Sequence, residues 1–175
     1  CETDFVSRGE QFQALAAQVA QTVLEKNPAD AAALAAAVGD QVTQLIASVG
    51  ENMQLGAFAR YSKDSDRDLV GRYIHANNKI GVLVFVRCGK AESAGKPEVQ
   101  ELAKNLAMQI AAANPLALDA ASLDPAVVER EREVYRQKAL EEGKPAQIVD
   151  KIAEGAVKKF QKEVCLLEQP FIRDD

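Results

Sequence analysis

Tryptophan is absent from this chain of 175 residues, which contains only one histidine and three cysteines. The hydrophobic share is 47%, but much of it is alanine, so a core has to be built from Leu, Ile, Val and six Phe. This composition favours a helix-rich protein over a sandwich of strands. The cysteines Cys1, Cys88 and Cys165 include no C-x-x-C pair, and His75 is the single histidine. We therefore predict no metal site and no disulfide framework, and we expect reduced thiols.

An excess of positive charge is also missing. Lys and Arg number 21 against 26 Asp and Glu, which gives a formal net charge of −5 and a pI of about 5.1. A strong nucleic-acid binder needs a basic stripe that displaces counterions from phosphates, but here the basic residues alternate with acidic ones. No apolar run approaches the roughly 20 residues of a membrane span. We expect the partner to be another protein, and neither a nucleic acid nor a membrane.

Motifs of nucleotide binding and catalysis are missing as well. Neither G-x-x-x-x-G-K-[ST] nor G-x-G-x-x-G occurs, so the chain is not predicted to bind a nucleotide itself. No Ser or Cys stands in a recognisable relation to His75, so no catalytic dyad is predicted. The enzymatic alternative is a thiol hydrolase that uses Cys88 or Cys165, although their apolar neighbours indicate inert thiols. We expect no enzyme, no catalytic residue and no cofactor.

Helical periodicity dominates the first 50 residues. Residues 7–10 have the spacing of a capping box, and the helix that follows is predicted to end at Pro28. A second helical stretch starts near residue 31 and is predicted to stop at Gly50. Between these points, Gly39-Asp40 is predicted to break the second helix. Two helical segments and one interruption are therefore expected here.

A change of period marks the middle of the chain. Alternation over residues 53–57 indicates a strand, and residues 69–75 and 79–87 form two more strand-like runs. Ala76-Asn77-Asn78 between them is predicted to turn, which makes an antiparallel pair and not a βαβ unit. Pro97 is predicted to start another helix, which Asn114-Pro115 stops. The apolar stripe predicted for this helix is Val99, Leu102, Leu106 and Ile110.

Two charged helices are predicted in the last third. Asp124-Pro125 is a good cap and first-turn pair for a helix that runs to Glu142. Gly143-Lys144-Pro145 reverses the chain, and a last helix extends through Phe160. The two helices are predicted to form an antiparallel hairpin with a solvated charged face. Residues 164–172 are predicted to be extended again.

Four stretches of the chain resemble the elongation factor Ts family, in the order and at the spacing that the family has. The resemblance covers essentially the whole chain, and its most specific part is the string Glu-Thr-Asp-Phe-Val. It implies that sequence is missing at both ends. The stretches are Cys1-Glu2-Thr3-Asp4-Phe5-Val6; Val49-Gly50-Glu51-Asn52; Tyr73-Ile74-His75 with Lys79-Ile80-Gly81-Val82-Leu83; and Glu142-Gly143-Lys144-Pro145 with Lys158-Lys159-Phe160 and Gln169-Pro170-Phe171.

The resemblance implies a guanine-nucleotide exchange factor whose partner is the GTPase elongation factor Tu. In the family, the pair that matches Asp4 and Phe5 lies at a tip, where the aromatic ring wedges between helices of the GTPase near its magnesium and phosphate site. Val49 and Gly50 match a helix end that lies against the GTPase. His75 matches a position that contacts it away from the nucleotide. The alternative is a scaffold fragment that binds the GTPase or the ribosome without accelerating exchange.

The resemblance also implies an α+β fold of two small lobes, each with helices packed on a short antiparallel sheet. An antiparallel helical hairpin, a coiled-coil arm in the family, interrupts the second lobe. A homodimer is an open possibility, and we expect the cytoplasm of a bacterium or the matrix or stroma of an organelle. The chain departs from the family at Gly56-Ala57, where an Arg-Arg pair is usual, and at Gln109, where a histidine is usual. The predicted domains are 1–64, 65–114, 115–162 and 163–175.

Overall fold

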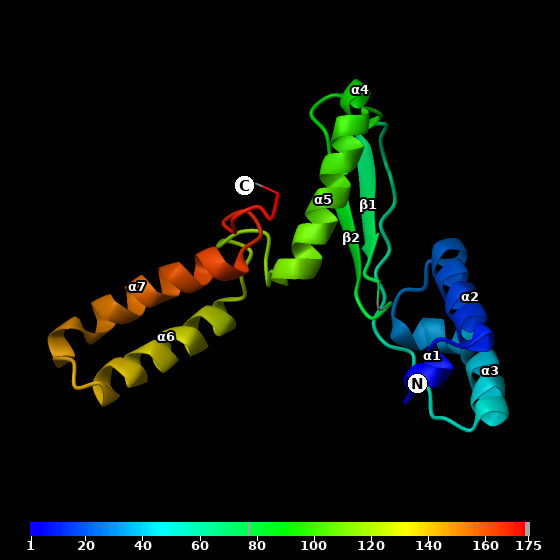
Figure 1. Cartoon of the computed structure of the whole chain (residues 1–175), viewed down its shortest axis with the longest axis horizontal. Coiled ribbons are helices and arrows are strands. Elements are labelled where there is room, and N and C mark those ends of the chain that lie inside the picture. The colour runs from blue at the N-terminus through cyan, green and yellow to red at the C-terminus, as the bar shows by residue number, and fades with distance from the viewer. Residues whose placement is uncertain (77, 174–175) are drawn as a thin grey trace. The chain divides into compact units, whose positions relative to one another are not determined.

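Two compact units make up the chain, Cys1–Ser62 and Lys63–Asp175. The structure, a computed structural model, describes residues 1–76 and 78–173. Helices account for most of both units, and the second unit contains a two-stranded antiparallel sheet (Figure 1). The prediction of an α+β protein is therefore confirmed in this coarse form.

The first unit consists of three helices and the extended segment that follows them. They are α1 (Asp4–Ser7), α2 (Glu10–Lys26) and α3 (Ala31–Val49). Helices α2 and α3 pack against each other around three buried side chains. Burial of such side chains stabilises a helix pair much more than helix propensity does. The buried centre is Val23, Leu34 and Val38, with Val19, Ala37, Val42, Leu55 and Phe58 packed against it.

Local signals account for the ends of these helices. Asn27 ends α2 in the left-handed region, and the Asp30 carboxylate caps α3 by accepting from the amide of Ala33 at 2.8 Å. Gly50 stops α3 with φ of +75°, as predicted, and its N–H donates to the carbonyl of Ile46. The predicted break at Gly39-Asp40 is wrong, because α3 runs through both. One glycine costs a helix about 1 kcal/mol, which the burial of the neighbouring Val38 offsets.

Two other local predictions for this unit are wrong. Residues 7–10 are not a capping box, because Ser7 is the last residue of α1 and Gly9 precedes α2 without a side-chain cap. Residues 53–57 form no strand, and none occurs in residues 1–62, all of which the structure describes. The N-terminal lobe therefore lacks the sheet expected for it. The alternation at Met53 and Leu55 reflects packing on the helical core, and no neighbouring strand receives backbone hydrogen bonds there.

Helix α3 also corrects the expectation about long apolar runs. Its 19 residues have a mean hydropathy of 1.3, so by length and composition alone it could cross a membrane. A core helix of a soluble protein passes the same test. Leu34 and Val38 of α3 lie in the centre of the unit against Val23 of α2, and 22% of the apolar window of α3 is buried.

A β-hairpin covered by a helix forms the centre of the second unit. Strands β1 (Asp68–Ile74) and β2 (Gly81–Arg87) are antiparallel, with Asp68 opposite Arg87 and Ile74 opposite Gly81. This confirms the predicted hairpin; Asn78 of its turn has φ of +57°, and Asn77 lies outside the described residues. The short helix α4 (Ala91–Ala94) leads into α5 (Pro97–Ala113), which packs on both strands.

Helix α5 approaches β1 through small residues. The predicted start at Pro97 is confirmed, but the predicted stripe is displaced, because Leu102 is exposed while Ala103 and Ala107 are buried. Gly71 of β1 faces this alanine surface: a Cβ atom at Gly71 would lie 2.6 Å from the carbonyl oxygen of Ala103. The backbones of strand and helix therefore approach as closely as a residue without a side chain permits.

An ion pair between buried Asp68 and half-exposed Arg87 joins the open ends of the two strands. The Asp68 side chain accepts hydrogen bonds from Arg87 Nε at 2.6 Å and from its terminal nitrogen at 2.9 Å. It also accepts from the backbone amides of Asp64 and Ser65 at 3.0 and 3.1 Å. These donors, Arg87 above all, lower the pKa of Asp68 from 3.8 to about 2. The charged carboxylate is thus fully partnered where the chain enters the hairpin.

We expect the second unit to lose stability as the pH falls below about 4. The pKa of Asp68 is lowered in the folded protein, so its ionised form contributes stability above pH 3.8, and this contribution disappears as the pH approaches 2. Thermal unfolding between pH 7 and pH 2 measures this loss. Asp68→Asn should have a lower Tm than wild type at pH 7 and converge with it in acid. Asp66→Asn, at an exposed neighbour, is the control and should follow the wild-type curve.

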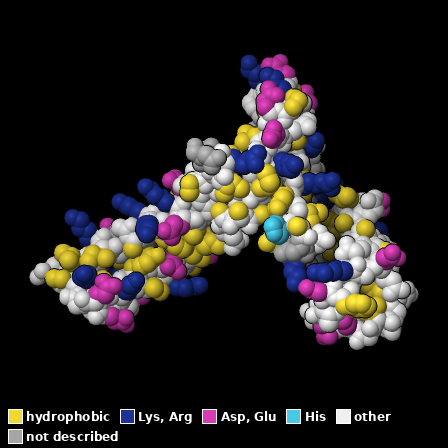
Figure 2. All heavy atoms as spheres, in the orientation of Figure 1, with side chains coloured by type: hydrophobic (Ala, Val, Ile, Leu, Met, Phe, Trp, Pro, Cys, Tyr) yellow, Lys and Arg dark blue, Asp and Glu magenta, His cyan; other side chains and the backbone are white. Residues whose placement is uncertain are grey.

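An antiparallel pair of helices completes the second unit. Helix α6 (Pro125–Glu141) begins after the predicted cap, since the Asp124 carboxylate accepts from the amide of Ala126 at 2.8 Å. Gly143 turns the chain with φ of +72°, and α7 (Ala146–Val164) packs back along α6 (Figure 1). Charged side chains of both signs and hydrophobic side chains lie together on this hairpin (Figure 2). The predicted hairpin is confirmed, and its role as a coiled-coil arm stays a prediction.

The chain after α7 is held to α5 by side-chain amides. Gln109 of α5 is buried; its Nε2 donates to Gln169 Oε1 and to the carbonyl of Pro170, and its Oε1 accepts from the amide of Ile172. The extended run predicted for residues 164–172 is wrong. Cys165 forms an isolated parallel β-bridge with Ala117, and the residues directly after it form a turn.

Candidate functional site

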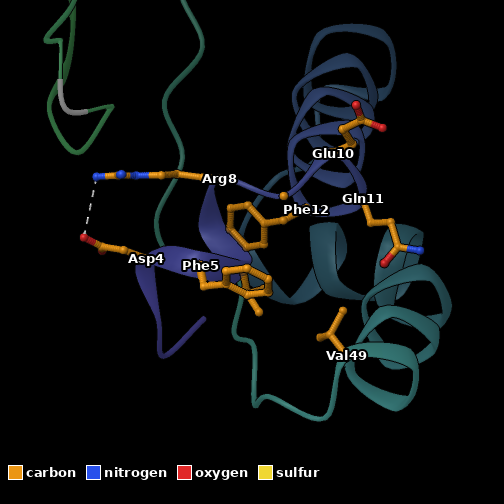
Figure 3. Close-up of a pocket in the computed structure, with 9 residues that line it drawn as sticks. Asp4, Phe5, Arg8, Glu10, Gln11, Phe12 and Val49 are labelled. Atoms are coloured by element: carbon orange, nitrogen blue, oxygen red, sulfur yellow. Dashed lines mark ion pairs between the residues drawn. The ribbon is translucent and has the colours of Figure 1, made fainter.

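A groove with a volume of about 630 Å³ lies beside the first turn of the chain, between the α1–α2 corner and the end of α3. Its wall combines apolar side chains with charged ones at the rim. Figure 3 shows the rings of Phe5 and Phe12 near each other, with Val49 facing them from α3. The lining residues are Asp4, Phe5, Val6, Arg8, Gly9, Glu10, Gln11, Phe12 and Val49.

Phe5 is the most exposed large hydrophobic residue among those described, with 88% of its surface accessible. It stands on the single turn of α1, next to Asp4, whose carboxylate lies 3.9 Å from the Arg8 guanidinium. The next residue, Val6, is buried. One side of the turn is therefore anchored in the unit, while the aromatic ring is presented to solvent. Exposed aromatic rings of this kind are typical of contact sites, where they bring a large area with little side-chain entropy.

The turn that carries Phe5 is tied to the end of α3 by Glu51. One carboxylate oxygen of Glu51 accepts from the backbone amides of Glu2 at 3.2 Å and Thr3 at 3.0 Å, and the other accepts from the Thr3 hydroxyl. The Thr3 hydroxyl oxygen in turn accepts from the amide of Val6 and so caps α1. The Thr3 hydroxyl, ahead of the amides, lowers the pKa of Glu51. These bonds join segments almost 50 residues apart.

Three of the five predicted contact residues line the same groove. Asp4 and Phe5 approach it from α1, and Val49 from the last turn of α3. Gly50 follows directly, and its left-handed backbone favours glycine although no atom would meet an added Cβ. The space beside this helix end is therefore open. The structure places these residues together, and their role in binding stays a prediction.

His75, the fifth predicted residue, belongs to the second unit. It follows β1 at the turn of the hairpin, where its backbone amide donates to the carbonyl of Ile80 and its own carbonyl accepts from the amide of Asn78. Its Nδ1 lies 2.9 Å from the Tyr73 hydroxyl, and both side chains are partly or fully accessible. The ring is thus held by Tyr73 of the preceding strand and faces solvent at the hairpin end.

Cys88 and Cys165 of the second unit are not arranged for catalysis with His75. Cys165 is completely buried, and burial raises the pKa of its thiol, which keeps it protonated. Cys88 follows Arg87 at the open end of the hairpin, whereas His75 lies at the turn. At about 3.3 Å per residue, the strand separates them by roughly 25 Å. Among residues 1–76 and 78–173, no three His, Cys, Asp or Glu side chains cluster as metal ligands would.

The sequence does not identify Phe12 or Glu51 as residues of this site. Phe12 falls within the helical periodicity of the first 50 residues, and periodicity does not distinguish a core ring from one that lines a groove. Glu51 was quoted only as part of a family stretch. One signal could have identified it: an acid directly after a helix C-terminus opposes the helix dipole, so it indicates a donor elsewhere in the chain.

The comparisons with known proteins agree with one another. The family described as Elongation factor TS matches residues 2–175. A protein of Desulfovibrio desulfuricans named Elongation factor Ts is 78% identical over 175 residues, which is all of this chain and 61% of that protein. Proteins of the same name from Nitratidesulfovibrio vulgaris and Clostridium acetobutylicum are 55% and 43% identical, covering 100% and 99% of this chain. The chain spans about three fifths of the length of these relatives.

Proposed function

Because this chain belongs to the elongation factor Ts family, we propose that it serves translation elongation as a guanine-nucleotide exchange factor. It binds the GTPase elongation factor Tu and promotes GDP release by disturbing the magnesium and phosphate site of that partner. Asp4, Phe5, Val49 and Gly50 form one contact surface, and His75 contributes a second contact. The chain supplies no catalytic group and no cofactor. It works in the cytoplasm of a bacterium, as its relatives in Desulfovibrio and Clostridium indicate.

The exposure of Phe5 at the rim of an apolar groove carries this proposal. An accessible phenyl ring has no stabilising role in the first unit, since the buried centre of that unit is built from other side chains. A ring that wedges between helices of a partner needs to project from a fixed backbone. The neighbouring groove has Phe12 and Val49 in its wall. It offers an apolar surface to a helix of the GTPase that the ring displaces.

Linkage explains how contact alone weakens the binding of GDP. Elongation factor Tu holds GDP through magnesium and backbone groups around the phosphates. If this chain binds the empty GTPase better than the loaded one, bound nucleotide must weaken the binding of this chain by the same ratio. A coupling of about 1–3 kcal/mol corresponds to about 5- to 150-fold. Insertion of Phe5 near the magnesium site supplies the coupling, and the contact at His75 supplies affinity and orientation.

The test is capture of elongation factor Tu by the immobilised chain, with and without nucleotide. Nucleotide-free GTPase should be captured about 5- to 150-fold more tightly than GTPase in excess GDP and magnesium. Phe5→Ala should reduce this preference. Leu24→Ala, at an exposed leucine of α2 outside the groove, should not. Capture that is equally tight in both states contradicts the exchange mechanism and supports the scaffold alternative.

A further inference from the structure

Helix α1 is too short to hold its own conformation. It has four residues, and the first turn of any helix is unfavourable because several backbone dihedral angles are fixed for one hydrogen bond. Isolated helices need about 12 residues or more to persist in water. The orientation of Phe5 therefore depends on contacts between α1 and the rest of the first unit.

The carboxylate of Glu51 provides such contacts on the N-terminal side of α1. It accepts from two consecutive backbone amides, those of Glu2 and Thr3, and from the Thr3 hydroxyl. The hydroxyl proton is thereby directed at Glu51, which leaves an oxygen lone pair free for the amide of Val6 at 3.3 Å. A chain of hydrogen bonds thus runs from the end of α3 through the Thr3 side chain into the first turn of α1.

The same contacts link Phe5 to the other side of the groove. Glu51 follows the Val49-Gly50 helix end, so the segment that carries Phe5 is fixed to the segment that carries Val49. On the inner side of α1, buried Val6 completes the attachment. Without the carboxylate, this turn would keep buried Val6, the backbone bonds at the α1–α2 corner and the hydrogen bond from Gln13 Nε2 to the Ser7 carbonyl.

We propose that Glu51 is a positioning residue of the exchange site, which holds the first turn of the chain so that Phe5 projects at a fixed angle beside Val49. This role rests on the proposed function. Glu51 acts through Phe5 and makes no contact of its own with the nucleotide or with magnesium. Geometry matters here more than charge, because a glutamine amide oxygen can accept from the two backbone amides while its nitrogen donates to the Thr3 hydroxyl oxygen.

The first measurement concerns the chain alone. Backbone amide hydrogen exchange of Thr3 and Val6 should be faster in Glu51→Ala than in wild type, while exchange in the α2–α3 core stays the same. Glu51→Gln should restore most of the protection. Unchanged exchange at Thr3 and Val6 in Glu51→Ala overturns the anchoring role, whatever the chain does to elongation factor Tu.

The second measurement is a double-mutant cycle on GDP release from elongation factor Tu. Glu51→Ala should reduce the acceleration about fivefold or more, and Glu51→Gln should recover most of it. In a Phe5→Ala background, Glu51→Ala should have no further effect, because nothing remains to be positioned. An equal effect in both backgrounds overturns the role, as does a loss in Glu51→Gln equal to that in Glu51→Ala. If the wild-type chain itself fails to accelerate release, the proposed function fails, and the positioning role fails with it.

Discussion

Phe5→Ala is expected to reduce the acceleration of GDP release from elongation factor Tu by about 5- to 150-fold, the size of a typical affinity coupling, because affinity differences appear mostly in dissociation rates. Because 88% of the Phe5 surface is accessible, removing the ring takes almost no packing from the first unit. The loss should therefore appear in exchange and not in stability. Release of labelled GDP measured by stopped flow gives the first quantity, and thermal unfolding gives the second.

Leu24→Ala provides the matched control for this experiment. Leu24 is an exposed apolar residue of α2 in the same unit, and it does not line the groove. Both variants should unfold at the wild-type temperature, but only Phe5→Ala should slow GDP release. Release at the wild-type rate in Phe5→Ala would show that the ring is not the wedge.

Gly71→Ala is expected to destabilise the second unit by about 3 kcal/mol, the upper part of the range for overpacked sites. The added Cβ would lie 2.6 Å from the Ala103 carbonyl oxygen and 2.8 Å from its carbonyl carbon. These are backbone atoms, so no change of rotamer relieves the clash, and β1 and α5 have to move apart. Chemical denaturation monitored by circular dichroism measures the loss.

Gly81→Ala is the control for this second prediction. Gly81 lies in the partner strand β2, opposite Ile74, and an added Cβ there meets no atom within 4 Å. The substitution should leave the free energy of unfolding close to that of wild type. Equal destabilisation by the two substitutions would mean that strand propensity, and not the approach of α5, determines the effect.

Signals that act within a few residues were enough to predict much of the fold. Gly50 and Asp124 delimit helices through their own backbone or side chain, and the β-hairpin is evident from two strand-like runs around a short turn. The strand predicted at residues 53–57 is wrong because the structure there depends on tertiary contacts and not on local signals. Alternation shows which side chains face a core, but the identity of that core, here a helix pair, is a tertiary property.

The same distinction applies to the site. Asp4, Phe5 and Val49 were named through a family resemblance, and the structure brings them to one groove. Their spacing in the sequence alone does not predict that arrangement. The bond between Glu51 and Thr3 joins residues 48 positions apart, so no local pattern reveals it. For α5, the helical spacing of large apolar residues predicted that they form the buried face, whereas alanines face β1. Small residues are needed there only because Gly71 of β1 approaches the helix closely, and the sequence does not show that approach.

Gln109 has a consequence for the behaviour of the second unit near neutral pH. Its amide secures the segment from Gln169 to Ile172 through two donated bonds and one accepted bond. An amide carries no titrating proton, whereas the histidine usual at this place in the family would change charge between about pH 5 and pH 8. The attachment of this segment to α5 through Gln109 therefore contains no side chain that changes charge across that pH interval.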